Sequence, residues 1–173
     1  DYAYLLESVE EQEKIGRYSF LSSAPSLIFK SKNRQIEITE FRNKNIKTRK
    51  KFITQTNPLE EVKKILQRYK YVTLKDLPRF TGGFVGYISY DMVRFFEKIP
   101  DKNKDDLNLP DCMLMLSDNL LIIDHIEHKI KIVSNVYIPD NRDGRSLKMA
   151  YQQGIKNIHN LKLDLSKQIK IKT

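Results

Sequence analysis

An acidic and a hydroxyl side chain stand next to each other at Glu7 and Ser8, directly after an apolar run that begins at Tyr4. A carboxylate accepts hydrogen bonds and a hydroxyl both donates and accepts them, so this pair could hold a polar ligand. An ordinary polar strand end has the same appearance, and these two residues alone favour that plainer interpretation. Their role depends on what surrounds them.

Acids and histidines gather again at Asp124, His125, Glu127 and His128. These residue types bind metals, but here they straddle a predicted turn and no further ligand lies at a recognisable spacing. We interpret them as solvated turn residues. Cys112 has apolar neighbours and no assigned base, which favours a buried thiol over a nucleophile. The sequence therefore predicts neither a catalytic residue nor a metal site in this chain.

The composition is that of a folded protein, because 40% of the 173 residues are hydrophobic and 31% are charged. The longest apolar stretches are far too short to cross a bilayer. A single cysteine cannot form an internal disulfide, which agrees with a reducing compartment. We therefore expect a soluble, cytoplasmic protein with no membrane partner.

A net charge of +9 could serve phosphate binding. The densest basic cluster comprises Lys44, Lys47, Arg49, Lys50 and Lys51, yet other lysines are spread along the chain and interleaved with acids. Proteins that read bases concentrate charge on one element, so the dispersed pattern favours a solvated surface. We expect no nucleic-acid partner and keep a basic nucleic-acid-binding module as an alternative from another class.

Local patterns predict several elements. Residues 26–41 read as two short strands around a turn at Ser31–Arg34, and residues 120–138 read as a second antiparallel pair. Asn57 and Pro58 open a helix. Its expected apolar face consists of Leu59, Val62, Leu66 and Tyr69.

A second helix is predicted over residues 146–161, with an exposed loop before it at 139–144 and another loop at 100–110. The apolar positions of this helix are Leu147, Ala150, Tyr151, Ile155, Ile158 and Leu161. Connections between the strands are too short for helical crossovers, so the sheet should be mostly antiparallel. The predicted fold class is α+β, mostly antiparallel sheet with flanking helices.

Residues 81–94, "TGGFVGYISYDMVR", predict a buried strand over Phe84–Ile88 in which Gly86 allows a close approach. Ser89 or Asp91 could cap a following helix. The stretch contains no phosphate-binding or dinucleotide-binding glycine pattern. The nearby aromatic residues are expected in the core or at a domain contact: Tyr87, Tyr90, Phe95 and Phe96.

Three separated blocks together resemble the N-terminal region of the anthranilate synthase component I family. They read "LLESVEEQEKIGRYSF", "GGFVGYISYDMVRFFEKIP" and "DNLLIIDHIEHKIKI". The resemblance implies that residues 1–173 form that region, as a single domain or part of one, within a sandwich-like architecture shared with a C-terminal chorismate-binding domain. That domain is expected to be absent from this chain.

Members of that family are lyases of tryptophan biosynthesis that convert chorismate and ammonia into anthranilate and pyruvate. The resemblance implies a glutamine amidotransferase subunit as partner and Mg²⁺ as cofactor of the full-length enzyme. The Mg²⁺ ligands and the catalytic histidine belong to the C-terminal portion, and no block of this chain matches them. By resemblance, this chain alone is expected to be inactive and to hold no cofactor.

The resemblance also implies a role for Glu7 and Ser8. In the family, the Leu-Leu-Glu-Ser block binds the feedback inhibitor L-tryptophan, which acts allosterically. By carry-over, Glu7 meets the ammonium group, Ser8 makes a hydrogen bond at the polar end, and Arg17 meets the carboxylate. Leu5 and Leu6 are expected to support the pocket rather than touch the ligand.

Two other interpretations stay open. Aminodeoxychorismate synthase component I of folate biosynthesis is homologous, although "LLES" followed by "EKIGRYSF" favours anthranilate synthase. A free amino-acid sensor domain is the other possibility, and calorimetry with tryptophan on this chain would test it.

Overall fold

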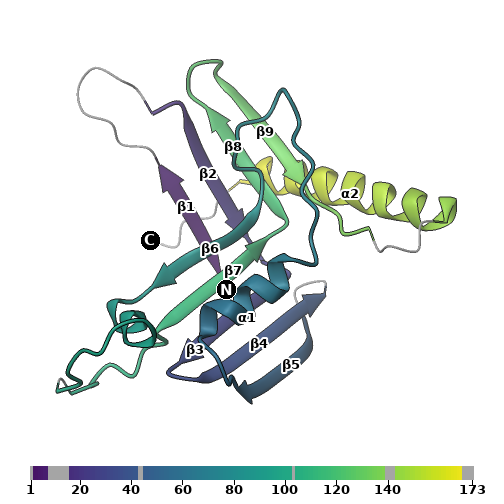
Figure 1. Cartoon of the computed structure of the whole chain (residues 1–173). Coiled ribbons are helices and arrows are strands. Elements are labelled where there is room, and N and C mark those ends of the chain that lie inside the picture. The colour runs from purple at the N-terminus through teal and green to yellow at the C-terminus, as the bar shows by residue number, and fades with distance from the viewer. Residues whose placement is uncertain (1, 8–15, 43–44, 103, 139–142, 169–173) are drawn as a thin grey trace. The chain divides into compact units, whose positions relative to one another are not determined.

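The computed structural model describes residues 2–7, 16–42, 45–102, 104–138 and 143–168 (Figure 1). Contacts divide the chain into two compact units. One unit combines residues 3–23 with residues 118–173, and the other comprises Tyr2 and residues 24–117. The first unit is therefore built from both ends of the chain.

The first unit contains a four-stranded antiparallel sheet in the order β1-β2-β8-β9. Its strands are β1 (Ala3–Glu7), β2 (Tyr18–Ser23), β8 (Asn119–Asp124) and β9 (Lys129–Ser134). The β8–β9 hairpin confirms the antiparallel pair predicted over residues 120–138. Leu5, Leu21, Leu121 and Ile132 face one another across the four strands, which fixes the register of the sheet.

Helix α2 (Gly144–Leu165) follows in the same unit, and Asp143 caps it by accepting a hydrogen bond of 2.7 Å from the Ser146 amide. The helix packs next to β9 through a stripe of small or polar residues. Asn157 donates a 3.1 Å hydrogen bond to Ser134, and a Cβ built at Gly154 would lie 3.4 Å from Val136. Gly154 is the buried residue of the helix.

The apolar positions predicted for α2 mostly do not face the sheet. Four of them are exposed, namely Leu147 (41%), Tyr151 (69%), Ile155 (50%) and Ile158 (37%). The packed stripe runs instead through Ala150, Gly154 and Asn157, because small side chains let the helix backbone come close to β9. The prediction of the helix is confirmed, and four of its six apolar positions are exposed.

The second unit contains a five-stranded antiparallel sheet in the order β5-β4-β3-β7-β6. Its strands are β3 (Leu27–Lys32), β4 (Gln35–Arg42), β5 (Asn45–Ile53), β6 (Gly83–Ile88) and β7 (Cys112–Ser117). The β3–β4 pair confirms the hairpin predicted over residues 26–41. Asn33 takes φ 48° at the turn, a backbone conformation that asparagine tolerates.

Helix α1 (Pro58–Leu66) begins as predicted, with the Asn57 side chain accepting a 3.0 Å hydrogen bond from the Glu60 amide. Val62 and Ile65 are buried in a cluster with strand residues such as Phe29 and Leu114. The predicted apolar face is wrong at Leu66 and Tyr69, which are 42% and 39% exposed. Leu66 is the last helical residue and Tyr69 lies beyond it, so neither follows the helical register onto the sheet.

A 3₁₀ helix, η1 (Tyr90–Phe95), follows β6 at the predicted position, with Ser89 as its N-cap residue but without a capping side-chain bond. Met92 is buried, and Phe95 packs against the core. Tyr90 and Phe96 are 80% and 59% exposed and lie outside the core, so for them only the expected domain contact stays a prediction. The α+β class with mostly antiparallel sheet is confirmed, and residues 100–110 form a loop where they are described.

Among the described residues, no helix is both long and apolar enough to cross a bilayer.

Gly86 lies close to the backbone of β7. A Cβ at this position would lie within van der Waals overlap of the Met113 carbonyl and 3.0 Å from the Leu114 Cα, and both are backbone atoms that cannot rotate away. We predict that Gly86→Ala lowers the free energy of unfolding by about 3 kcal/mol, as measured by urea titration.

Gly144→Ala is the matched control, because nothing lies within 4 Å of a Cβ built there and the residue begins a helix. It should leave the free energy of unfolding unchanged or raise it slightly. Equal effects of the two substitutions would contradict the close approach.

Candidate functional site

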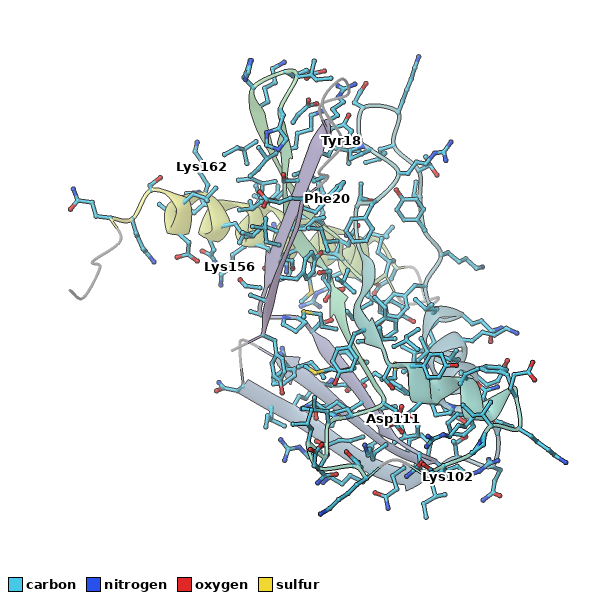
Figure 2. The ribbon with its side chains drawn as sticks, turned by 90° about the vertical axis from the view of Figure 1, so that its left-hand side faces the viewer. Tyr18, Phe20, Lys102, Asp111, Lys156 and Lys162 are labelled. Carbon is cyan, nitrogen blue, oxygen red and sulfur yellow. The ribbon has the colours of Figure 1, made fainter. Side chains whose placement is uncertain are left out.

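One end of the four-stranded sheet carries a group of polar and charged side chains. There β1 and β8 finish, and β2 and β9 begin, since Glu7 is paired with Ser19 and Asp124 is paired with both Tyr18 and Lys129. Figure 2 labels Tyr18 near this end and Phe20 farther along the same strand. All of these residues belong to the first unit.

A partly buried ion pair joins the start of β2 to the end of β8. Arg17 donates from Nε to both Asp124 oxygens, at 3.2 and 3.3 Å, and from Nη2 to Oδ2 at 3.0 Å. The side chain of Asp124 is fully buried, whereas that of Arg17 is 41% exposed. Arg17 also reaches Glu127 at 3.1 Å, so its guanidinium is shared between two carboxylates.

Asp124 has further partners in the β8–β9 turn. Its Oδ1 accepts hydrogen bonds from the amides of Ile126 and Glu127, at 3.2 and 3.1 Å, and Lys131 lies 3.3 Å from Oδ2. Hydrogen bonding from Arg17, followed by the Glu127 amide and Lys131, holds the pKa of Asp124 well below its usual range despite burial. The carboxylate is therefore charged at neutral pH, and the expectation that Asp124 is a solvated turn residue is wrong.

The aromatic ring of Tyr18 lies beside this ion pair. The Arg17 guanidinium carbon is 4.9 Å from the ring centroid, and the Lys131 ammonium is 5.9 Å from it. Both cations are within the range of a cation–π interaction. The network thus contains an aromatic face as well as the two charged partners of Asp124.

His125 makes the next connection to β2. Its Nε2 lies 2.7 Å from the Ser19 hydroxyl oxygen, and its backbone amide donates to the Arg17 carbonyl at 2.8 Å. Ser19 is buried, and the imidazole is exposed. Asp124 and His125 together therefore fix both ends of the segment Arg17–Ser19.

Glu7 lies directly across from Ser19 and is exposed. Among the described residues, its carboxylate makes no hydrogen bond or ion pair. Leu5 and Leu21, two residues along their strands from Glu7 and Ser19, are 52% and 37% exposed. The Glu7 carboxylate, which can accept hydrogen bonds, thus lies beside the exposed side chains of Leu5 and Leu21.

The sheet separates the predicted ligand-binding residues. Successive side chains of a strand point to opposite faces, so Glu7 and Ser19 share one face while Tyr18 and Asp124 share the other. His125 lies with Ser19, whereas the Arg17 guanidinium lies with Asp124. Glu7, Ser19 and His125 thus lie on one face of the sheet and the Arg17 guanidinium lies on the other. Ser8 lies outside the described residues.

Sequence reasoning did not select Ser19, Asp124 or His125 as site residues. Arg17 and Asp124 are separated by 107 positions, so no local pattern links them. The only available signal was the Asp-His pair at the end of an apolar strand. That pair was interpreted as part of a turn.

Other candidate features have structural explanations. Cys112 is fully buried, as predicted, and burial beside Asp111 raises the pKa of its thiol to about 11. An open hollow of about 480 Å³ on the other sheet is lined partly by Lys32 and Lys51. These two cations pair with Asp105 at 2.6 Å and with Glu37 at 3.0 Å. Among the described residues, no group of three or more His, Cys, Asp or Glu side chains could hold a metal ion.

The chain belongs to the chorismate binding enzyme family, which it matches over residues 3–170. Within that family it is similar to anthranilate synthase component 1 of Acetivibrio thermocellus, with 40% identity over 93% of this chain and 31% of the relative. It is 32% identical to a probable anthranilate synthase component 1 of Schizosaccharomyces pombe, over 95% of this chain and 29% of the relative. These matches confirm the resemblance inferred from the three sequence blocks.

The fold agrees with a solved structure. The crystal structure of anthranilate synthase component I from Streptococcus pneumoniae TIGR4 superimposes with a TM-score of 0.65 at 19% identity, covering 94% of this chain and 32% of that chain. The chain therefore spans about a third of the length of the relatives that it matches.

The ion pair at Asp124 should support the stability of the first unit. We predict that Asp124→Asn lowers the melting temperature by on the order of 5 °C at pH 7, because Arg17 loses its buried partner. Asp101→Asn removes an exposed partner of Arg94 and should change the melting temperature little.

The pH dependence follows from the lowered pKa of Asp124. In the unfolded chain the pKa of Asp124 is about 3.9, and above that pH its full contribution to stability is present. The contribution is lost as the pH falls from there towards the lower pKa of the folded protein. The difference in melting temperature between the parent and Asp124→Asn should therefore become smaller below about pH 4. A difference that stays constant down to strong acid would contradict this account.

Proposed function

We propose that this chain is the N-terminal regulatory region of an anthranilate synthase component I. The observation that carries the proposal is its 40% identity to anthranilate synthase component 1 of Acetivibrio thermocellus over 93% of the chain. The full-length enzyme would convert chorismate and ammonia into anthranilate and pyruvate, as a cytoplasmic lyase of tryptophan biosynthesis. A glutamine amidotransferase subunit would supply the ammonia.

Catalysis is assigned to the part of the enzyme outside this chain. The described residues do not fit a Mg²⁺ site, since they contain no group of three or more candidate ligands. We therefore assign no Mg²⁺ ligand to the described residues, and the catalytic residues are assigned to the C-terminal portion by the resemblance alone. Its contribution to the enzyme is regulatory.

The regulatory ligand in this proposal is L-tryptophan, bound at the polar end of the four-stranded sheet. The exposed Glu7 carboxylate is a suitable acceptor for an ammonium group, because no described side chain neutralises it. Leu5 and Leu21 provide apolar contact area beside it. The resemblance also assigns a hydrogen bond with the ligand to Ser8, the next residue in the sequence.

Inhibition at a distance requires two states of the enzyme with different affinities for tryptophan. A coupling free energy of about 1–3 kcal/mol between the tryptophan and chorismate sites would suffice. The relatives are about three times as long as this chain, so the remainder of the enzyme can complete the pocket. The isolated chain is expected to bind tryptophan weakly or not at all.

Product analysis tests the enzyme class. Incubation of the full-length enzyme with chorismate and ammonia should yield anthranilate and pyruvate. Accumulation of aminodeoxychorismate instead would assign the chain to the homologous enzyme of folate biosynthesis.

Ser8→Phe tests the tryptophan site. We predict that the substitution raises the tryptophan concentration for half-inhibition of the full-length enzyme at least about tenfold, because a bulky ring replaces a hydrogen-bonding hydroxyl. Uninhibited turnover should stay close to that of the parent. Superimposable inhibition curves for the two enzymes would remove Ser8 from the site.

A further inference from the structure

We propose that Ser19 and His125 belong to the amino-acid site on the face that carries Glu7, and that His125, not Arg17, meets the carboxylate of the ligand. This inference rests on the proposed tryptophan site and changes one of its predicted contacts. It follows from which face each side chain occupies, which groups are already paired, and which hydrogen-bonding atoms remain available.

The face is defined by the strand register. Glu7 and Ser19 are directly opposite each other, so their Cβ atoms lie about 5 Å apart on the same side of the sheet. The His125 imidazole reaches the same side, where Nε2 lies 2.7 Å from the Ser19 hydroxyl oxygen. Glu7 and His125 therefore both lie next to Ser19 on one face of the sheet.

Arg17 is poorly placed for the same task. Its Nε and Nη2 atoms bond to the fully buried Asp124, and Nη2 also pairs with Glu127. A ligand carboxylate that took over this guanidinium would leave a buried carboxylate without its main partner, which is costly. Arg17 instead acts as a positioning residue that holds the start of β2.

His125 retains a nitrogen for the ligand. Ser19 can donate its hydroxyl proton to Nε2, in which case Nδ1 carries the ring proton and becomes a donor. Among the described residues, no group is bonded to Nδ1, and the side chain is exposed. The backbone bond from His125 to the Arg17 carbonyl fixes the residue at the edge of the site.

The arrangement matches the parts of a free amino acid. Glu7 would accept from the ammonium group, His125 would donate to the carboxylate, and the row of Leu5 and Leu21 would contact the apolar side chain. All of these side chains lie on one face. The earlier assignment to Arg17 would require the ligand to contact both faces of the sheet.

Three substitutions of His125 in the full-length enzyme test the inference, with tryptophan affinity measured by calorimetry. Asparagine can place an amide donor near the former Nδ1 but cannot reach Ser19, whereas glutamine can reach Ser19 but lacks the Nδ1 donor. We expect His125→Leu and His125→Gln to weaken tryptophan binding about tenfold or more, and His125→Asn to weaken it clearly less.

A purely structural role for His125 predicts the opposite order, with glutamine tolerated and asparagine not, and that order would overturn the inference. Unchanged affinity in His125→Leu would also overturn it. His128→Gln is the matched control, because His128 lies in the same turn and is exposed. Arg17→Lys should lower the melting temperature while changing tryptophan affinity less than about threefold.

Glu7→Gln separates failure of this inference from failure of the proposed function. If Glu7→Gln weakens tryptophan binding but the His125 variants do not, the tryptophan site stands and His125 is removed from it. If the parent enzyme does not bind tryptophan, both proposals fail. A larger loss of affinity in Arg17→Lys than in His125→Leu would restore Arg17 as the carboxylate partner.

Discussion

The ion pair between Arg17 and Asp124 is the interaction on which the candidate site depends. A fully buried carboxylate is tolerated only when several donors compensate for its lost hydration, and here a guanidinium, two backbone amides and an ammonium group do so. The same contacts join the start of β2 to the β8–β9 turn that contains His125. Ser19 and its partner Glu7 are consequently held in one register.

Two glycines let neighbouring elements pack closely. Gly86 lets β6 lie close to the backbone of β7, and Gly154 lets α2 lie close to the segment that follows β9. In both places the absence of a side chain determines the spacing of the elements.

Much of the fold could be predicted because its signals are local. Asn33 favours a tight turn, Asn57 and Pro58 start a helix, and alternating residues around Ile130 and Ile132 indicate a strand. The family followed from sequence blocks alone. Glu7 was placed correctly at the close of the first strand, but its predicted roles and those of Ser8 and Arg17 remain predictions.

The remaining features depend on contacts between distant parts of the chain. Arg17 and Asp124 carry no sequence signal for each other at a separation of 107 residues. The sequence does not reveal the inner face of α2, because alanine, glycine and asparagine are weakly hydrophobic or polar. The large apolar residues beside them dominate the hydrophobic pattern of the helix. The end of α1 at Leu66 similarly removed Tyr69 from the expected helical face.

The outward apolar ridge of α2, formed by Leu147, Tyr151, Ile155 and Ile158, also bears on how the chain behaves at high concentration. Like charges keep molecules apart, and a net charge of +9 provides such repulsion at low ionic strength. Added salt screens that repulsion, and sulfate or phosphate also strengthens the tendency of apolar surfaces to meet. The solubility of this chain at high concentration therefore depends on the balance between charge repulsion and association through the exposed apolar side chains of α2. The salt in the buffer changes that balance.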